Sequence, residues 1–391
     1  MPSPRRALAT LFVIVFTDLI GFGIVIPLLP LYAEHFAPTP VQFGLLMAAY
    51  SAMQFLFAPI LGRLSDRVGR RPVLLISIAG SIAGFVLFAL AHSLAWLFAS
   101  RLLAGMGGGN IGTAQAVIAD VTSREQRAKG MGLIGAAFGL GFIVGPAMAA
   151  LVLPLGESAP GWAAAGFSVA AWLMTLFFLP ETRPAGTAPA GGVLTGFARI
   201  RAGLHRPDLA PLLAVGFIVI TGFAAFEVTF AQFLHARLGL PHQQVSLLFV
   251  YVGVLAAVIQ GGLVGRIAPR LGERRMLIAG LACTGLGLLA LAGAGRLGSI
   301  MAILPLVALG SGLSMPALSA LVSHTAGAEE QGLALGAFQG LGSLARVLGP
   351  FAAELALGRW GVAAPPLAAA ALALAAAVGA GVMLRRRPAA A

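Results

Sequence analysis

The sequence predicts an all-α membrane protein whose twelve transmembrane helices form two pseudo-symmetric bundles of six. Three observations lead to this prediction. Of the 391 residues, 59% are hydrophobic and only 10% are charged, whereas soluble domains are about 25% charged. Apolar runs long enough to cross a bilayer recur along the whole chain. Basic residues fall in short clusters between these runs, and part of the pattern in the first half is repeated in the second.

We place the twelve spans on the apolar runs in chain order. Each run is close to or longer than the roughly 20 residues that a helix needs to cross the hydrocarbon core. The runs are continuous rather than alternating, which excludes transmembrane strands. The first run is too long for a removable signal peptide, and it lacks a small-residue cleavage site. The spans are 8–32, 41–61, 73–92, 94–118, 129–153, 161–179, 209–235, 244–264, 277–295, 299–323, 332–356 and 361–384.

Basic residues are concentrated on one side of the predicted spans. Twenty of the 25 lie before the first span, after the second, fourth, sixth and eighth spans, or after the last. The other side has only Arg237, Arg296 and Arg359. By the positive-inside rule both termini are cytoplasmic, and an odd number of spans would contradict the pattern. We therefore expect a multi-pass protein of the cell inner membrane or plasma membrane.

The longest connection between spans separates two halves. We predict an N-terminal six-helix bundle at 1–180, a cytoplasmic linker at 181–208 and a C-terminal six-helix bundle at 209–391. Within the linker, the Gly, Pro and Ala residues of Pro184–Gly192 are typical of a flexible segment.

The two halves contain an internal repeat. Residues 62–75 read GRLSDRVGRRPVLL, and residues 265–278 read GRIAPRLGERRMLI, at an offset of 203. Gly-Pro pairs in spans five and eleven are 204 residues apart. Two matches at nearly one offset, in corresponding helices, indicate duplication. Many secondary transporters are built from repeated halves around a central path.

These motifs resemble those of the major facilitator superfamily, in its drug:proton antiporter branch, over essentially the whole chain. The resemblance implies the major facilitator fold. The matching segments are the loop signature GRLSDRVGRRP at 62–72, the helix-four motif RLLAGMGGG at 101–109, the exporter-type helix-five motif GAAFGLGFIVGP at 135–146, the helix-one pattern of Asp18 with Pro27 and Pro30, and Pro180-Glu181-Thr182 at the end of helix six.

Within that branch the chain is most similar to the tetracycline-efflux group. It departs from that group at three places. Gly84 stands where the group has an acidic residue in helix three, and Ala256 stands where it has a histidine in helix eight. Span nine contains no acidic residue. The resemblance therefore predicts the pump architecture and leaves the substrate open.

The 62–72 loop is interpreted as a cytoplasmic gate. Asp66 lies among four arginines, whereas positive-inside arginines alone would need no acid. Asp66, Arg67 and Arg70, together with Asp120, are expected to form an ionic latch, which the resemblance implies stabilises the outward-facing state. Glycines in the loop allow tight turns and close helix approach. In the second copy Pro269 replaces Asp66. The gate candidates are Gly62, Asp66, Arg67, Gly69, Arg70, Arg71 and Asp120.

Small residues and proline in spans five and eleven predict a hinge. Small residues let membrane helices approach each other, and proline leaves a carbonyl unpaired. Ordinary helix packing explains the same residues, and both roles can hold. The hinge candidates are Gly141, Gly145, Pro146, Gly349 and Pro350.

Ionisable residues inside spans are costly, so they are functional candidates by default. Asp18 lies in span one with Arg101 at a similar depth in span four, and Glu227 lies in span seven with Arg346 in span eleven. Each pair could be a structural ion pair. We favour carboxylates that take up and release a proton, with the arginines favouring the deprotonated state in one conformation. Residues near the outer ends are expected to form a wet rim: Glu34, His35 and Glu354.

Polar side chains within spans could line a substrate path or bond neighbouring helices; they are Gln54, Asn110, Gln115, Gln260 and Gln339. Residues 107–112 match GxGxxG, but no strand precedes them, which argues against nucleotide binding. Cys283 is the single cysteine, and the six histidines show no ligand spacing, so we expect neither a disulfide nor a metal site. No cofactor is expected.

The predicted function is proton-coupled secondary transport that exports lipophilic small molecules by alternating access, a drug:H⁺ antiport. The alternative is proton-coupled uptake or export of a specific metabolite or sugar; the helix-five motif favours export. An enzyme is not expected, because the spans contain no paired catalytic groups. A receptor or scaffold is disfavoured by buried acids. Expected partners are the substrate, protons and membrane lipid, but not nucleic acid, and the chain is expected to be a monomer.

Overall fold

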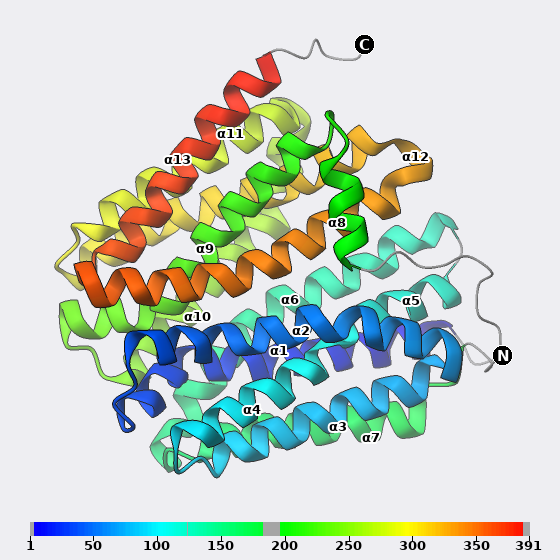
Figure 1. The fold of residues 1–391 in the computed structure, drawn as a ribbon, viewed down its shortest axis with the longest axis horizontal. Helices are drawn as coiled ribbons and strands as arrows, with labels where there is room; N and C mark the ends of the chain where they lie inside the picture. Colours follow the sequence, from blue (N-terminus) through cyan, green and yellow to red (C-terminus); the bar gives the residue numbers. More distant parts are fainter. Residues whose placement is uncertain (1–3, 123, 183–195, 386–391) are drawn as a thin grey trace. The chain divides into compact units, whose positions relative to one another are not determined.

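The computed structural model describes residues 4–122, 124–182 and 196–385. Within these ranges the chain is almost entirely helical and contains no strand (Figure 1). The predicted spans lie on helical segments, although one span is interrupted and some helices hold more than one span. Nine apolar windows could cross a membrane in the described part, and one of them, His242–Ala292, is 51 residues long and holds two predicted spans. The predicted fold class is confirmed.

The chain divides into two compact units, and unit 1 comprises Met1–Pro38, Ala49–Val193 and Pro241–Gly253. The predicted fourth span is interrupted in it by a 3₁₀ turn at a Gly-Gly-Asn sequence, where poor helix formers follow one another. Its elements are α1 (Pro4–Glu34), most of α2 (Pro40–Val68), α3 (Arg70–Ala89), α4 (Leu94–Gly107), η1 (Gly108–Asn110), α5 (Ile111–Val121), α6 (Arg124–Val152), η2 (Leu153–Leu155), α7 (Ala159–Phe178) and part of α10 (His242–Val258).

Unit 2 comprises Thr39–Ala48, Leu194–Leu240 and Val254–Ala391. The helices here merge predicted spans. Its elements are α8 (Gly196–Leu204), α9 (Ala210–Leu238), the π-helical η3 (Ile259–Leu263), α11 (Val264–Ala292), α12 (Leu297–Trp360), α13 (Ala364–Arg385) and the remaining parts of α2 and α10.

Two long helices of unit 2 change direction inside. In α11, Gly272 has φ 71° and ψ 156°, which ends the eighth span and begins the ninth. A straight helix of the 64 residues of α12 would be about 96 Å long, three times the hydrocarbon thickness. Figure 1 shows α12 folded back on itself, and its two apolar windows are Leu297–Ala326 and Leu333–Trp360.

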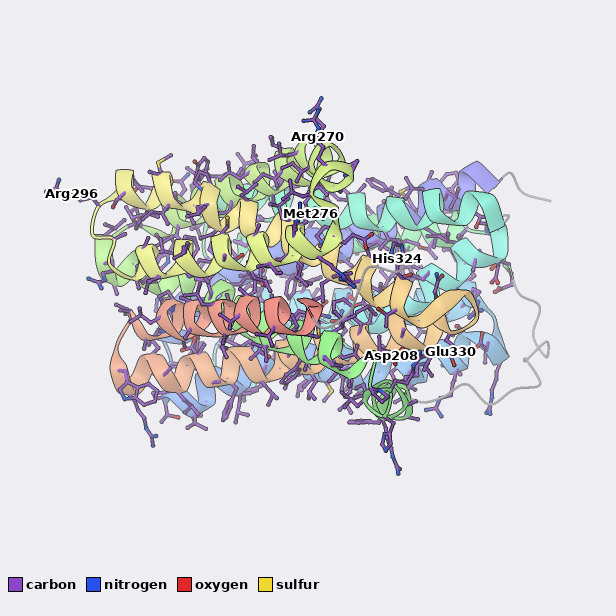
Figure 2. The ribbon with its side chains drawn as sticks, turned by 90° about the horizontal axis from the view of Figure 1, so that it is seen from above. Asp208, Arg270, Met276, Arg296, His324 and Glu330 are labelled. Carbon is purple, nitrogen blue, oxygen red and sulfur yellow. The ribbon has the colours of Figure 1, made fainter. Side chains whose placement is uncertain are left out.

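The predicted linker contains a helix that the sequence did not suggest. Helix α8 packs closely on α12 and α9. If a Cβ atom were added to Gly203, it would lie 2.8 Å from the side chain of Ala337 and 2.9 Å from that of Leu213, so there is little space between these helices. The segment expected to be flexible, Pro184–Gly192, lies outside the described residues. Figure 2 shows Asp208, His324 and Glu330 at the same end of unit 2, and Arg296 at its other end.

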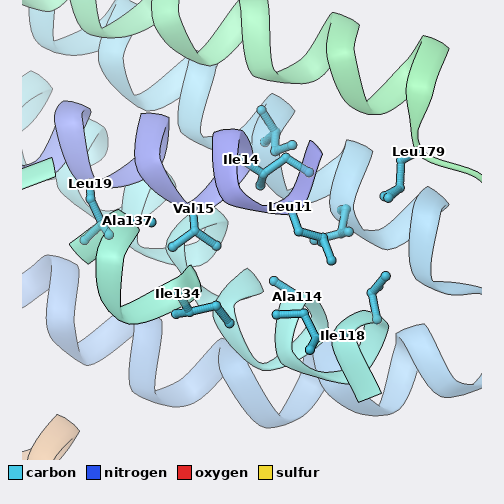
Figure 3. Close-up of a cluster of buried hydrophobic side chains, with 12 residues drawn as sticks. Leu11, Ile14, Val15, Leu19, Ala114, Ile118, Ile134, Ala137 and Leu179 are labelled. Carbon is cyan, nitrogen blue, oxygen red and sulfur yellow. The ribbon is translucent and has the colours of Figure 1, made fainter. Parts of the chain in front are cut away.

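The core of unit 1 is built where α1 crosses α3, α5 and α6 (Figure 3). The side chains facing the centre are aliphatic, and many have no exposed surface. Positions three and four apart on α1 supply one side of the cluster, as expected for one face of a helix. The buried residues are Leu11, Ile14, Val15, Leu19, Leu74, Ile78, Ala114, Val117, Ile118, Ile134, Ala137 and Leu179.

Helix contacts repeat between the units in the same register as the sequence. In unit 1, Gly107 of α4 lies against Ser81 of α3; in unit 2, Gly310 of α12 lies against Thr284 of α11. Both residues of the second contact are 203 positions after those of the first. The same offset relates a second pair of contacts, Gly84 on Ala104 and Gly287 on Val307. The repeat therefore extends from the loops to the helix interfaces.

We predict that a large side chain at Gly107 disrupts unit 1. A Cβ there would lie 2.6 Å from the carbonyl oxygen of Ser77, and backbone cannot move aside as a side chain can. Gly107→Leu should lower the unfolding temperature of the detergent-solubilised protein, since overpacking typically costs about 1–3 kcal/mol. Gly112→Leu is the matched control, because nothing lies within 4 Å of a Cβ at that site. Equal melting temperatures for the two variants would contradict the packing argument.

Candidate functional site

Arg70 is the centre of a charged network at the start of α3. Its side chain is only 6% exposed, and it contacts two carboxylates. Nη1 lies 2.8 Å from Asp66 Oδ1, one helical turn earlier in the chain, and Nε lies 3.1 Å from Asp120 Oδ2 near the end of α5. Nη1 also donates to Ser65 Oγ at 2.7 Å. A buried guanidinium is thus matched by two acids and a hydroxyl, as burial of a charge requires.

Glu181 completes this network from the other side of α3. Its carboxylate accepts hydrogen bonds from the backbone N–H groups of Arg70 at 2.9 Å and Arg71 at 3.1 Å. It therefore caps the helix N-terminus, where an anion is favoured. Gly69 makes room for it: the residue has φ 115°, and a Cβ would lie 2.5 Å from Glu181 Oε2. The Arg71 side chain donates to the carbonyl oxygen of Leu176.

The structure brings together part of the predicted gate. Asp66, Arg70 and Asp120 meet as expected. Two other expectations are wrong in detail. Arg67 is exposed, and it makes no contact with the Arg70 network within the described part of the chain. Gly62 lies inside α2 with nothing within 4 Å of a Cβ, so it makes no close approach.

Sequence reasoning missed Glu181 and Ser65 as members of the network. The signal for Glu181 was present, since Pro180-Glu181-Thr182 is one of the segments that carry the family resemblance. Its role depends on the end of α7 lying beside the start of α3, more than 100 residues earlier. That proximity is a tertiary fact which the spacing of the motif does not contain.

Unit 2 has an ion pair at the corresponding positions with its charges reversed. Glu273 is 203 residues after Arg70, and His324 is 204 residues after Asp120. The Nδ1 atom of His324 lies 3.2 Å from Glu273 Oε2. The acid is now on the α11 side and the base on the α12 side, and the pair is ionic only when the histidine is protonated.

A second charged cluster of unit 2 lies before α9. Arg206 pairs with Asp208 at 2.5 Å and also with Glu330 of α12. The hydrogen bond to Asp208 raises the pKa of Arg206 above its ordinary high value, so the guanidinium stays charged. These contacts hold the segment before α9 to the turn within α12.

Asp18, the candidate proton carrier of α1, pairs with an amide rather than with Arg101. Asn110 Nδ2 donates to Asp18 Oδ2 at 2.5 Å, and Asn110 itself is completely buried in η1. The structural ion pair considered for Asp18 is therefore absent from the described part of the chain. The partner that sequence reasoning placed on the substrate path is the one that holds this carboxylate.

Arg101 is buried against an aromatic ring. The residue is 3% exposed, its guanidinium carbon lies 5.3 Å from the centre of the Phe88 ring, and Nε donates to Ser100 Oγ at 3.3 Å. The Phe88 ring in turn contacts the Tyr32 ring, with the two ring centres 4.6 Å apart. Cation–π contact stabilises a desolvated cation. Nη2 of Arg101 is buried, and no described residue forms a hydrogen bond with it.

Glu227 and Arg346 of unit 2 interact through their charges. The charge of Arg346 acts on the Glu227 carboxylate, while Arg346 Nη2 lies 3.4 Å from Ser343 Oγ on its own helix. Both side chains are partly buried. A carboxylate whose charge is balanced by a nearby cation is suited to gain or lose a proton as their distance changes.

The remaining path candidates differ in their surroundings. Gln54 Nε2 donates to the carbonyl oxygen of Gly108 at 2.9 Å and so ties α2 to η1. Gln115 is partly buried, whereas Gln260 and Gln339 are exposed on unit 2. Gln54 and Asn110 thus bond neighbouring helices.

The hinge candidates lie at the closest approach of their helices. A Cβ on Gly145 of α6 would lie 2.7 Å from the Cα of Gly23 in α1, and one on Gly349 of α12 would lie 2.5 Å from the carbonyl oxygen of Thr221 in α9. A Cβ on Gly141 would meet the side chain of Leu19. The helices continue through Pro146 and Pro350. The packing role is present at both sites.

One predicted rim residue is not on a rim. Glu354 is 2% exposed, and its Oε1 atom is buried without a partner. Gly44 of α2 and Gln232 of α9 cover it within unit 2. His35 is exposed as expected, 3.8 Å from Glu157. The side chain of Glu34 lies outside the described part.

Comparison with known proteins gives the family. The family model described as Major Facilitator Superfamily matches residues 11–350 and 212–391. The chain is 35% identical over 352 residues to a tetracycline resistance protein, class E, of Escherichia coli, which covers 88% of this chain and 86% of the relative.

Solved structures agree. The human organic anion transporter MFSD10 (TETRAN) superposes with a TM-score of 0.73 at 28% identity, over 97% of this chain and 100% of the other. A bacterial homologue of the human lysosomal transporter Spinster, inward-facing and occupied, superposes with a TM-score of 0.83 at 15% identity, over 99% and 98% of the two chains, which shows the fold alone. The chain therefore belongs to the Major Facilitator Superfamily and is a multi-pass membrane transporter of small molecules rather than an enzyme.

Proposed function

We propose that this chain exports lipophilic small molecules in exchange for protons by alternating access. The observation that carries the proposal is a carboxylate inside a span of each unit: Asp18, held by Asn110, and Glu227, acted on by Arg346. Groups of this kind are expensive in a membrane and mark proton paths. The tetracycline resistance relative supports export as the direction. Protons entering down a potential release about 2.3 kcal/mol per 100 mV.

A second candidate is transport of an organic anion. Arg101 is a buried cation with an unpartnered Nη2 and no acid in contact within the described part of the chain. An anionic group on the substrate would satisfy it. The human relative MFSD10, whose structure superposes on this chain, is an organic anion transporter.

We expect neutralisation of the carboxylates to uncouple transport. Substrates are first found with a panel of lipophilic drugs and organic anions in a pump-deficient host, with and without a proton uncoupler. In proteoliposomes, Asp18→Asn or Glu227→Gln should abolish accumulation of that substrate against its gradient, while downhill exchange continues. A pH dye follows the protons. Glu157→Gln, at an exposed acid, is the control.

If the double variant still accumulates substrate against its gradient, both acids are structural and the coupling scheme is wrong. If the wild-type protein still accumulates substrate against its gradient when the proton uncoupler is present, transport is not coupled to protons. The panel separates lipophilic drugs from organic anions directly.

The Arg70 network is proposed as the latch that stabilises one conformational state, outward-facing as the family resemblance implies. Its members come from α2, α3, α5 and the end of α7. A network that joins four elements breaks when any of them moves. Because Arg70 is buried, the network has a large electrostatic effect on the balance between states.

Asp66→Asn should slow transport while membrane expression stays near normal. Loss of one carboxylate leaves Arg70 under-compensated, and coupling changes of this kind typically shift a two-state equilibrium roughly 5- to 150-fold. The measurement is the initial transport rate normalised to the amount of protein in the membrane. Arg63→Gln serves as control, since Arg63 is exposed and donates to the carbonyl oxygen of Pro59 on its own helix. If Asp66→Asn transports substrate at the normal rate, the charged loop serves only to set the orientation of the protein in the membrane.

The proposed location is the inner or plasma membrane, with both termini in the cytoplasm and the chain acting as a monomer among lipids. The distribution of basic residues supports this orientation.

Reporter tags at either terminus or within 184–192 should be protected from outside reagents in intact cells. Tags at Glu157 or Gly239 should be accessible, because the opposite orientation would place most of the basic residues outside the cell, against the positive-inside rule. A terminus that is labelled from outside would overturn the span count.

A further inference from the structure

Glu354 is a buried acid that the coupling scheme above does not use. It lies in α12, five residues after Gly349, where α12 packs against α9. Its Oε2 atom is 3.5 Å from Gln232 Nε2 of α9, at the long limit of a hydrogen bond. A Cβ on Gly44 of α2 would lie 3.3 Å from the Cβ of Glu354. Three helical segments of unit 2 therefore enclose the carboxyl group.

The hydrogen-bond count at this site shows a missing donor. Glu354 Oε1 and Gln232 Oε1 are both buried, and neither has a hydrogen-bond partner among the described residues. Both atoms are acceptors when the acid is ionised. A proton on Glu354 would supply an O–H donor to a site whose two unpaired atoms are both acceptors. The pair therefore fits a neutral carboxylic acid better than a carboxylate.

No cation compensates a charge on Glu354 in the described part of the chain. On α9, Arg237 donates to the carbonyl oxygen of Ala292, and His235 contacts that of Leu240. Arg359 of α12 is exposed. Residues 39–48 of unit 2 contain no ionisable side chain. A trapped water could donate hydrogen bonds, but it would leave a buried charge unpaired, which is unfavourable.

The fold itself does not need an acid at this position. Unit 1 makes the corresponding crossing between α6 and α1 around Gly145 and Pro146. At the 204-residue offset of the two Gly-Pro pairs, Ala150 occupies the place of Glu354 and is buried. An apolar residue thus suffices in the related interface.

We propose that Glu354 is a proton-binding site and that Gln232 positions it by hydrogen bonding. The site lies along the same pair of helices as Glu227 and Arg346. Gln232 is five residues beyond Glu227, about 7.5 Å along α9, and Glu354 is eight residues beyond Arg346, about 12 Å along α12. Glu354 therefore lies nearer than Glu227 to the ends of these helices, at Leu238 of α9 and Trp360 of α12.

The transport role of this site rests on the proposed function. A proton from outside water bonds to Glu354 Oε1, whose O–H donates to Gln232 Oε1. When the interface opens, the Glu354 O–H bond breaks and water carries the proton to the Glu227 carboxylate, where a new O–H bond forms. Glu354 is left ionised and ready for the next proton.

Infrared spectroscopy of the purified full-length protein tests the protonation directly. Wild type at neutral pH should show a carboxylic acid C=O band that shifts in D₂O and is lost in Glu354→Gln. Glu157→Gln, at an exposed acid, should keep the band. Gln232→Leu should shift its frequency, which provides a readout if Glu354→Gln does not fold. A spectrum of Glu354→Gln identical to wild type, or a band unmoved in Gln232→Leu, would overturn the proposal.

Transport in proteoliposomes tests the relay. Glu354→Gln should lose the part of transport that an imposed pH gradient drives, yet keep downhill substrate exchange. Unchanged gradient-driven transport would overturn the relay even if the infrared band is assigned to Glu354. Wild type without any gradient-driven transport would instead reject the proposed function, and the infrared result would still decide whether Glu354 holds a proton.

Discussion

Close contact between helix backbones is the constraint on which the rest of this structure depends. In lipid, apolar surface gains little by leaving one helix surface for another, so helices are held by packing and by internal satisfaction of the backbone. Gly107 against α3 and Gly310 against α11 provide such contacts at equivalent positions of the two units. Gly145 and Gly349 do so at the crossings with α1 and α9. Polar groups inside the spans, such as Asp18 and Asn110, meet where these packed helices bring them together.

The two units use the same frame for different electrostatics. At the start of α3, Arg70 binds two acids, whereas the corresponding position in α11 has Glu273 with a histidine partner. At the Gly-Pro crossing, unit 1 has an apolar residue and unit 2 has Glu354. Duplication preserves packing because small residues cannot be replaced, while charges change freely where solvent or a partner accommodates them.

Much of the architecture could be predicted from the sequence. The spans follow from the length of the apolar runs, and the repeat appears as matching residues at a constant offset. The meeting of Asp66, Arg70 and Asp120 was also predicted. The failures share one cause. The position of Glu354 near the end of a span predicts a rim residue, yet α9 and α2 cover it. Gly62 belongs to the right motif, yet a Cβ added there would meet no atom within 4 Å. The place of a residue along its own helix does not determine which residues of the neighbouring helices contact it.

By itself, the sequence determined that this protein lies in a lipid bilayer and is helical, and it revealed the internal duplication and the family motifs. Each of these features depends on local composition or on spacing along the chain. Only the tertiary structure decided which polar groups meet. Asp18 binds Asn110 instead of Arg101, and Glu181 caps α3 across more than 100 residues of chain. The physical reason is that a side chain's partner depends on the rotation and crossing of two helices. A difference of one residue in register turns a buried partner into an exposed side chain.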